Sequence, residues 1–266
     1  MSGFYENYET ILFSRDGKVV TATLNRPDNL NAINPVLDAE LLRMFRDVDD
    51  DPECNVLVLT GAGRAFSAGG DIPDMLEGLD DMSKFTQGYK NGKRILQTML
   101  DCEKPIICRM NGDAIGLGAT IALFCDIVIA DSSARIADPH VKVGLVAGDG
   151  GAAIWPHLVG YAKAKQYLLS GDLLSANEAA EIGLIAFSVP TEELDALVGK
   201  WAGKLANGAQ AAIRYTKVTL NIGLRQQFAS MVDAGFALET VSSRTKDHAE
   251  AVNAFVAKRK PNFTGE

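Results

Sequence analysis

Short apolar runs that lead into glycine-rich loops occur twice in this chain, and this repetition constrains the fold more than any other feature. Residues 55–60 are rich in Val and Leu and predict a buried strand. A glycine-rich loop over 61–71 follows, and a helix is expected over about 83–100. The pattern then repeats as a strand over 105–110, a glycine-rich loop over 111–118, a short helix over 119–123 and a strand over 125–130. The recurrence predicts related supersecondary units without a clean sequence repeat.

The N-terminal residues add two strands and a helix to this pattern. Residues 11–14 and 19–24 flank Asp16-Gly17, a pair typical of a β-hairpin turn. Asn34 can cap a helix and Pro35 suits its first position, and the leucines that follow recur at helical spacing. We therefore expect a hairpin and then a helix before the first buried strand.

Helix signals dominate the second half of the chain. The expected helices cover residues 162–169, 176–182, 192–206, 209–220 and 225–257. Strands first and helices last predict an α/β (α+β) fold, in which a sheet-containing core carries a helical appendage. The 266 residues suit one large domain or a domain with such an appendage. We place a boundary after Pro190, giving a core over 1–190 and a helical region over 191–266.

Composition and charge exclude several classes of protein. Hydrophobic residues at 47% and charged residues at 23% are ordinary for a globular chain and argue against disorder. The net charge of −8 lacks the basic surplus of a general nucleic-acid binder. No basic and apolar leader opens the chain, and no apolar run reaches about 18 residues. We expect a cytoplasmic protein with no nucleic-acid or membrane partner.

Cysteine and histidine spacing predicts no metal site. The chain has four cysteines without a CxxC pair and only three histidines, so a structural zinc site is not expected. The cysteines are interpreted as reduced, mostly buried thiols. They are Cys54, Cys102, Cys108 and Cys125.

The two glycine-rich loops match none of the common glycine motifs. Neither has the lysine of a phosphate-binding P-loop or the pattern of a dinucleotide fingerprint, and the G-x-S-x-G of serine hydrolases is absent. Glycines also let backbone N–H groups approach a ligand, and two such groups aimed at one oxygen form an oxyanion hole. The second loop runs into an apolar helix, whose N-terminus would add a positive dipole end. Spacing alone favours ordinary loops with glycine turns.

An ordered set of motifs over nearly the whole chain resembles the crotonase, or enoyl-CoA hydratase/isomerase, superfamily. Each motif alone is weak, but their common order makes the resemblance specific. The motifs are LNRP (24–27), NAIN (31–34), FSAGGDI (66–72), Pro105, Asn111-Gly112, Ala114, Gly116, Gly118, CDI (125–127), Gly171-Asp172, EAA (178–180), GLI (183–185) and AFVAKRKP (254–261).

This resemblance implies a fold, an assembly and a substrate. The family fold is a spiral of ββα units with a C-terminal helical region that builds trimers, often paired into hexamers. Its usual substrate is an acyl-CoA thioester, whose oxygen is held by two backbone N–H groups that stabilise an enolate. Carried over by position, these donors are Gly70 and Leu117. No cofactor is implied beyond the coenzyme A of the substrate, because the thioester itself makes the neighbouring C–H acidic.

The resemblance also implies where coenzyme A would bind. It would pass the loop from Arg26 to Ala32 and the segment from Ala68 through Gly70 and Asp71 to Ile72. Lys258 matches a family lysine that reaches the adenine end, often in a neighbouring subunit. The cluster around Lys258 also suits a solvated helix end that the helix dipole favours.

The chain departs from the family at both usual catalytic glutamates. Thr120 stands where family hydratases carry the first, and His140 where they carry the second. Threonine cannot act as a base near neutral pH, whereas histidine can. His140 is therefore our first candidate for an acid or base, and a histidine at the edge of the core is the alternative. Asp149, between glycines, is the second candidate, and its alternative is a turn aspartate that bonds its own loop.

We therefore expect an acyl-CoA-processing enzyme of the enoyl-CoA hydratase/isomerase type. Its reaction could be double-bond isomerisation, thioester hydrolysis, or C–C or C–halogen cleavage with His140 and Asp149 as acid and base. A catalytically silent acyl-CoA-binding protein is the alternative from another class. A homotrimer or hexamer is expected.

Overall fold

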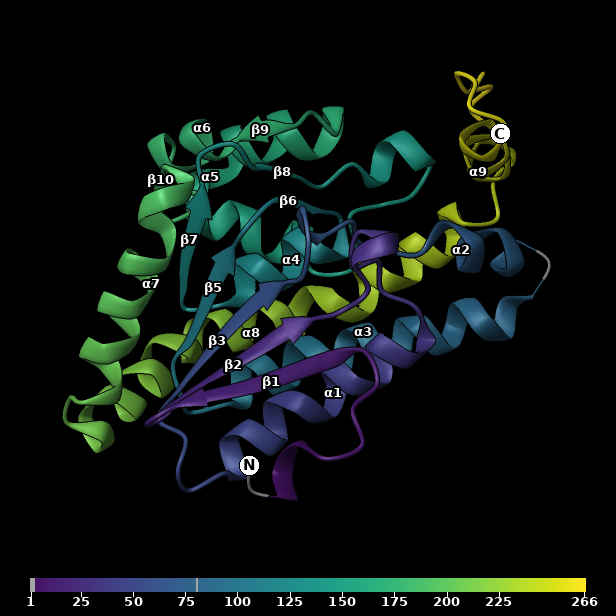
Figure 1. Ribbon diagram of the computed structural model, residues 1–266. Coiled ribbons are helices and arrows are strands. Elements are labelled where there is room, and N and C mark those ends of the chain that lie inside the picture. Colours follow the sequence, from purple (N-terminus) through teal and green to yellow (C-terminus); the bar gives the residue numbers. More distant parts are fainter. Residues whose placement is uncertain (1–2, 80) are drawn as a thin grey trace.

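Two β-sheets form the centre of the computed structural model, which describes residues 3–79 and 81–266 (Figure 1). The larger sheet is parallel except for its first strand. Its six strands are, in spatial order, β1 (Ile11–Asp16), β2 (Val19–Leu24), β3 (Val56–Gly61), β5 (Ile106–Met110), β7 (Ile127–Asp131) and β10 (Phe187–Val189). The smaller sheet contains β4 (Ala65–Ser67), β6 (Asp113–Ile115), β8 (Arg135–Ala137) and β9 (Leu174–Ser175).

The chain moves between the sheets in successive turns, which confirms the predicted spiral of ββα units. Each turn adds one strand to the larger sheet and the next strand to the smaller one, and a helix then returns the chain. The turns are β3 with β4, β5 with β6, and β7 with β8. The α-helices of this part of the chain are α1 (Pro35–Asp50), α2 (Ile72–Gly78), α3 (Met82–Asp101), α4 (Leu117–Phe124), α5 (Gly151–Ser170) and α6 (Ala176–Glu181). Short 3-10 helices are η1 (Gly3–Tyr5), η2 (Pro27–Asn29) and η3 (His140–Val143).

The predicted N-terminal hairpin and helix are both present. Strands β1 and β2 pair antiparallel around Asp16-Gly17, and Gly17 has a φ of +54° that suits glycine. The Asn34 side chain accepts a hydrogen bond from the N–H of Leu37, and Pro35 is the first residue of α1. Such a cap contributes about 1 kcal/mol to helix stability.

The predicted glycine-rich loops each contain a short strand that the sequence did not indicate. β4 lies within the first loop and β6 within the second, and the two strands pair in parallel. Each has only three residues, too few to show a period-two pattern, and their pairing depends on contacts made after the chain folds. The pairing brings the two loops together at one edge of the smaller sheet.

Side chains of the larger sheet alternate between two apolar layers. Val56 and Val58 of β3 face α7 (Thr191–Ala206), while Leu57 and Leu59 face the core that contains α1 and α3. Figure 1 shows α7 along one face of the sheet and the long helix α8 (Gln210–Ser242) beyond the other. The alternation follows from the opposite directions of successive strand side chains.

The C-terminal region is helical, as predicted, with one different division. The expected break between residues 220 and 225 is absent, because α8 continues through it while Asn221 and Arg225 donate hydrogen bonds to the Leu100 carbonyl. The break comes later, where Thr245 caps α9 (Lys246–Val256). Likewise α5 begins before the predicted residue 162 and bends at Gly160, whose φ is +72°. The boundary after residue 190 remains a prediction.

Within residues 3–79 and 81–266, we find no helix with the length and apolar character needed to cross a membrane.

Candidate active site

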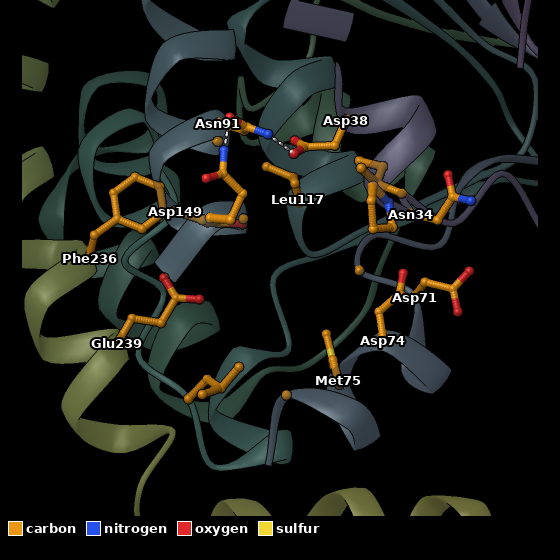
Figure 2. Close-up of a pocket in the computed structure, with 18 of the residues that line it drawn as sticks. Asn34, Asp38, Asp71, Asp74, Met75, Asn91, Leu117, Asp149, Phe236 and Glu239 are labelled. Carbon is orange, nitrogen blue, oxygen red and sulfur yellow. Dashed lines mark hydrogen bonds between the residues drawn. The ribbon is translucent and has the colours of Figure 1, made fainter. Parts of the chain in front are cut away.

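A cavity of about 440 Å³ opens between the sheet edge, α1, α2, α3 and α8 (Figure 2). Its wall includes four of the residues singled out from the sequence as catalytic candidates, namely Gly70, Leu117, His140 and Asp149. Apolar side chains form much of the remainder, among them Ile33, Met75, Leu145 and Phe236. The fold therefore brings together residues that lie up to 79 positions apart in the chain.

The two glycine-rich loops meet at the cavity because glycines let their backbones approach. Gly69 has a φ of +82°, and a Cβ built on it would lie only 2.5 Å from the Ile115 carbonyl oxygen and 3.3 Å from the Leu117 nitrogen. A Cβ on Gly118 would lie 2.7 Å from Cβ and the carbonyl oxygen of Ser67. Real Cβ atoms do not tolerate such distances, so these glycines are required for the close approach.

Gly70 and Leu117 are therefore neighbours on the cavity wall. Leu117 is the first residue of α4, where a backbone N–H has no acceptor within its own helix and where the helix dipole is positive. Gly116 turns the chain into this helix with a φ of +55°. A segment of this geometry can bind an anionic oxygen.

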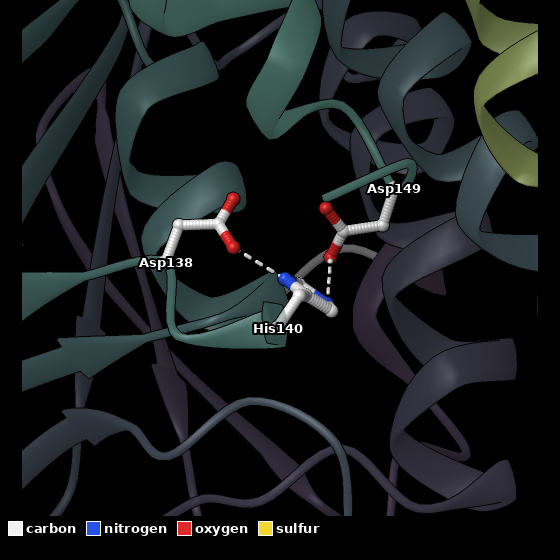
Figure 3. A group of neighbouring side chains, drawn as sticks. All are labelled: Asp138, His140 and Asp149. Carbon is white, nitrogen blue, oxygen red and sulfur yellow. Dashed lines mark hydrogen bonds and ion pairs between the residues drawn. The ribbon is translucent and has the colours of Figure 1, made fainter. Parts of the chain in front are cut away.

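His140 lies between two carboxylates (Figure 3). Its Nδ1 is hydrogen-bonded to Oδ1 of Asp138, and its Nε2 faces Oδ2 of Asp149 at 3.4 Å. All three residues are buried. The ring is thus fixed at both nitrogens, which orients it and favours its doubly protonated form.

The Asp149 carboxylate is held by three groups. Its Oδ1 accepts from the Thr120 hydroxyl at 3.3 Å and from the Gly151 N–H at 3.4 Å, and its Oδ2 faces His140. Thr120, which cannot itself be a base, thus holds a carboxylate. The Gly151 contact is also a turn bond within the local loop, and the catalytic role of Asp149 remains a prediction.

Burial and charge shift the pKa values of this pair in ways that suit proton transfer. Burial by itself would lower the pKa of His140, but the Asp149 and Asp138 carboxylates raise it well above its ordinary value. The two carboxylates therefore favour the imidazolium form of His140. Burial raises the pKa of Asp149, and the positive His140 counteracts part of that rise. The pKa of Asp149 thus lies above its ordinary value, which makes its carboxylate form a stronger base.

The same three side chains could also hold a cation. Single donor atoms of Asp138, His140 and Asp149 lie within 4.8 Å of one another. However, both ring nitrogens of His140 already face carboxylate oxygens, so the imidazolium supplies the positive charge that a metal would bring. The donor set fits a proton-based network better than a metal site.

Two carboxyl residues of the site were missed in the sequence. Asp138 stands two residues before His140, and an acid at that spacing was a signal that could have been weighed. Glu239 lines the cavity from α8 and lies 99 positions after His140 in the chain. No local sequence pattern indicates that it belongs to the site. Burial raises the pKa of Glu239 to about 8, with Asp149 and Asp138 adding to the rise and His140 opposing it.

Of the residues predicted to bind coenzyme A, Gly70 and Asp71 line the cavity. The Arg26 guanidinium contacts the Ala32 carbonyl and donates to Oδ2 of Asp71 at 3.0 Å, and so ties the two predicted binding segments together. Ala68 and Ile72 flank the cavity-lining Gly70 and Asp71 in the chain. Lys258 is exposed beyond α9 with a φ of +53°. The contact of these residues with coenzyme A remains a prediction.

Comparisons with known proteins agree with the resemblance seen in the motifs. A family model described as enoyl-CoA hydratase/isomerase matches residues 14–266. A crotonyl-CoA hydratase of Syntrophomonas wolfei is 35% identical over 261 residues, covering 96% of this chain and 98% of the relative. A 1,2-epoxyphenylacetyl-CoA isomerase of Escherichia coli is 35% identical over 264 residues, covering 97% and 99%.

Solved structures agree as well. The crystal structure of an enoyl-CoA hydratase/isomerase from Mycobacterium paratuberculosis superposes with a TM-score of 0.89 at 37% identity, over 94% of this chain and 99% of that one. The names of these three relatives include both hydratases and isomerases, so similarity alone does not choose between the two reactions.

Proposed function

This chain is an acyl-CoA-processing enzyme of the enoyl-CoA hydratase/isomerase family, and we propose that its reaction is the isomerisation of a double bond in an enoyl thioester. The observation that carries the proposal is the Asp149 carboxylate on the cavity wall. Of the two predicted acid or base residues, His140 and Asp149, only Asp149 is able to accept a proton. His140 is positively charged and Thr120 is a hydroxyl, so neither supplies a second base.

In the proposed reaction, Asp149 removes a proton from the carbon next to the thioester. The electron pair of the broken C–H bond moves into the thioester, whose oxygen becomes anionic. The N–H groups of Gly70 and Leu117 stabilise that oxygen, an interaction typically worth about 3 kcal/mol per donor in the transition state. The resulting dienolate takes a proton at its γ-carbon, the double bond re-forms between the α- and β-carbons, and the mass is unchanged.

His140 acts in this scheme by holding Asp149 ionised. Its positive charge beside Oδ2 lowers the free energy of the carboxylate relative to the neutral acid, while burial keeps the carboxylate basic. Asp138 orients the ring from its other side. The three side chains thus form one unit in which Asp149 alone faces the substrate as a base.

Mass spectrometry of acyl-CoA panels tests the reaction type. The purified chain is incubated with β,γ-enoyl, α,β-enoyl, dienoyl, β-keto and halogenated aryl thioesters, beside its Asp149→Asn variant. A chromatographic shift at constant mass, lost in the variant, is the expected result. A mass increase by one water would indicate hydration, and release of free coenzyme A would indicate hydrolysis. Either result would contradict isomerisation. Cleavage of C–C or C–halogen bonds, or binding without any product, would also contradict the proposal.

Oligomeric assembly through the C-terminal helices is part of the proposal. Large apolar side chains are exposed on α8 and α9 of the single chain, where Leu220 is 74% and Val241 66% exposed. Monomeric proteins rarely leave such side chains gathered in solvent. A homotrimer or a hexamer would cover them and would also bring Lys258 towards a neighbouring subunit.

A further inference from the structure

Glu239 is one of several carboxyl residues on the cavity wall, and the proposed isomerisation leaves it unused. Glu239 is only 8% exposed, and its Oε2 atom has no hydrogen-bond partner among the residues that the structure describes. Figure 2 shows the carboxyl group pointing into the cavity from α8. A buried polar atom without a partner is costly, so its position in a substrate cavity calls for an explanation.

The backbone places this carboxyl group beside the loop that carries Asp149. A Cβ built on Gly148 would lie 2.3 Å from the Gly235 carbonyl oxygen and 3.0 Å from Oε2 of Glu239. Glycine is required at both positions, 148 and 235, for α8 and this loop to approach so closely. The Val146 N–H also donates to the Ser242 hydroxyl at 3.1 Å, which fixes α8 one turn further on. The position of Glu239 relative to Asp149 is therefore fixed by the fold.

We propose that Glu239 is a second catalytic residue, the acid that returns a proton to the substrate after Asp149 has removed one. This inference rests on the proposed isomerisation and deepens it by naming the proton donor. A donor must lie on the cavity wall, carry a proton at neutral pH and be separate from the group that has just accepted one. Glu239 meets the first and third conditions by its position.

Burial, with help from two nearby carboxylates, meets the second condition. On the side of η3 and the loop that follows, the Asp138 and Asp149 carboxylates surround the single positive charge of His140. A charge on buried Glu239 would be poorly solvated, and Asp149 and Asp138 would also repel it. These effects outweigh the opposing His140 and raise the pKa of Glu239 to about 8. Other titratable residues also line the cavity. They are Asp38 of α1, Asp71 at the N-cap of α2, Asp74 and Glu77 of α2, and His248 of α9, whose pKa is lowered by burial.

The proton movements balance over one turnover. Asp149 accepts the α-proton and becomes a neutral acid, and the C–H electron pair forms the dienolate. As the dienolate collapses, its π electrons form a bond to the acidic hydrogen of Glu239, and the O–H electron pair stays on the Glu239 oxygen. Glu239 is then a carboxylate and Asp149 is protonated. Loss of a proton from Asp149 to solvent and uptake of one by Glu239 restore the starting state.

The variant Glu239→Gln separates the two proton transfers. Glutamine has nearly the same size as the neutral acid and can donate a hydrogen bond, but it cannot release a proton. With a β,γ-enoyl-CoA in D2O, we expect this variant to incorporate deuterium at the α-carbon at a rate near that of the wild type. Its formation of the α,β-isomer should fall 10²- to 10⁴-fold. Glu193→Gln, an exposed change on α7, is the matched control that should alter neither rate.

The pH profile gives an independent readout. The donor is active when protonated, so kcat of the wild type should fall as pH rises through about 8. Glu239→Asp should keep that alkaline limb at reduced turnover, because it retains a titrating acid, and the residual activity of Glu239→Gln should lack it. Normal turnover in Glu239→Gln, or residual turnover that keeps the same alkaline limb, would overturn the inference.

Carbon-13 NMR of the wild-type protein labelled in its glutamate carboxyls does not depend on turnover. One glutamate titrating near pH 8 is expected, and titration of every glutamate below pH 6 would overturn the inference. Failure of the proposed function looks different. In that case the wild type itself would neither exchange the α-proton nor form the isomer.

Discussion

At the residue scale, the alternation of charge around His140 explains how a histidine can replace a carboxylate without becoming the base. Carboxylates face both ring nitrogens and favour the protonated ring, so in the proposed scheme His140 sets the properties of Asp149. The same reasoning gives Thr120 the role of a hydrogen-bond donor to Asp149. The two departures from the family pattern thus converge on one carboxylate.

Replacing His140 by glutamine should move the acid limb of the pH profile. Without the positive charge, ionised Asp149 loses stabilisation and its pKa rises. Because the base is active when ionised, the acid limb of kcat/KM should shift to higher pH by about 1 unit or more. Activity should therefore fall more at pH 6 than at pH 8. His157→Gln, at an exposed position on α5, is the control. An unchanged acid limb in His140→Gln would remove His140 from the account.

Sequence reasoning identified only part of this network. His140 was a candidate because the resemblance places it where the family carries a catalytic glutamate, and Asp149 because it is a carboxylate flanked by glycines. Asp138 and Glu239 were not found, because their roles depend on a ring orientation and on a helix that packs across the cavity. Such tertiary proximity leaves no mark in local spacing.

At the element scale, the N-terminus of α4 is positioned by close contact between the two glycine-rich loops. The motif FSAGGDI and the second loop were recognised from sequence, but the strands β4 and β6 that align them were not. Three-residue strands carry too little pattern to be predicted. Their parallel pairing nevertheless sets the distance between Gly70 and Leu117.

Gly118→Ala tests this positioning. The added Cβ would lie within 2.7 Å of Ser67, whose backbone cannot move without shifting the loop, so the first turn of α4 must be displaced. We expect at least a tenfold loss of kcat and a lower Tm. Gly199→Ala is the control, since position 199 is exposed on α7 and nothing lies within 4 Å of a Cβ built there. Alanine should stabilise that helix by about 1 kcal/mol. Wild-type turnover in Gly118→Ala would contradict the assigned role of the α4 N-terminus.

At the scale of the whole molecule, the α/β spiral and its helical C-terminal region were predictable because their motifs occur in family order along the chain. The division of the C-terminal helices was less predictable. Asn221 and Gly223 suggest a break in sequence, yet hydrogen bonds to the Leu100 carbonyl hold α8 continuous there. This continuity carries Phe236 and Glu239 to the cavity.

The assembly gives a prediction at this scale. Sedimentation equilibrium should yield three or six times the 28.5 kDa of one chain, because the exposed apolar side chains of α8 and α9 need a cover. Leu220→Asp, which places a charge on that surface, should shift the equilibrium towards smaller species. A wild-type mass of one chain at all concentrations would contradict the proposed assembly.

Deuterium exchange at the α-carbon tests most directly the claim that Asp149 is the base of a thioester isomerase. Wild-type protein and Asp149→Asn are incubated with a β,γ-enoyl-CoA in D2O, and the thioester is analysed by mass spectrometry. We expect rapid deuterium incorporation with the wild type and a loss of at least 10²-fold with the variant, while thioester binding is retained. Equal incorporation by both proteins, or none by the wild type, would contradict it.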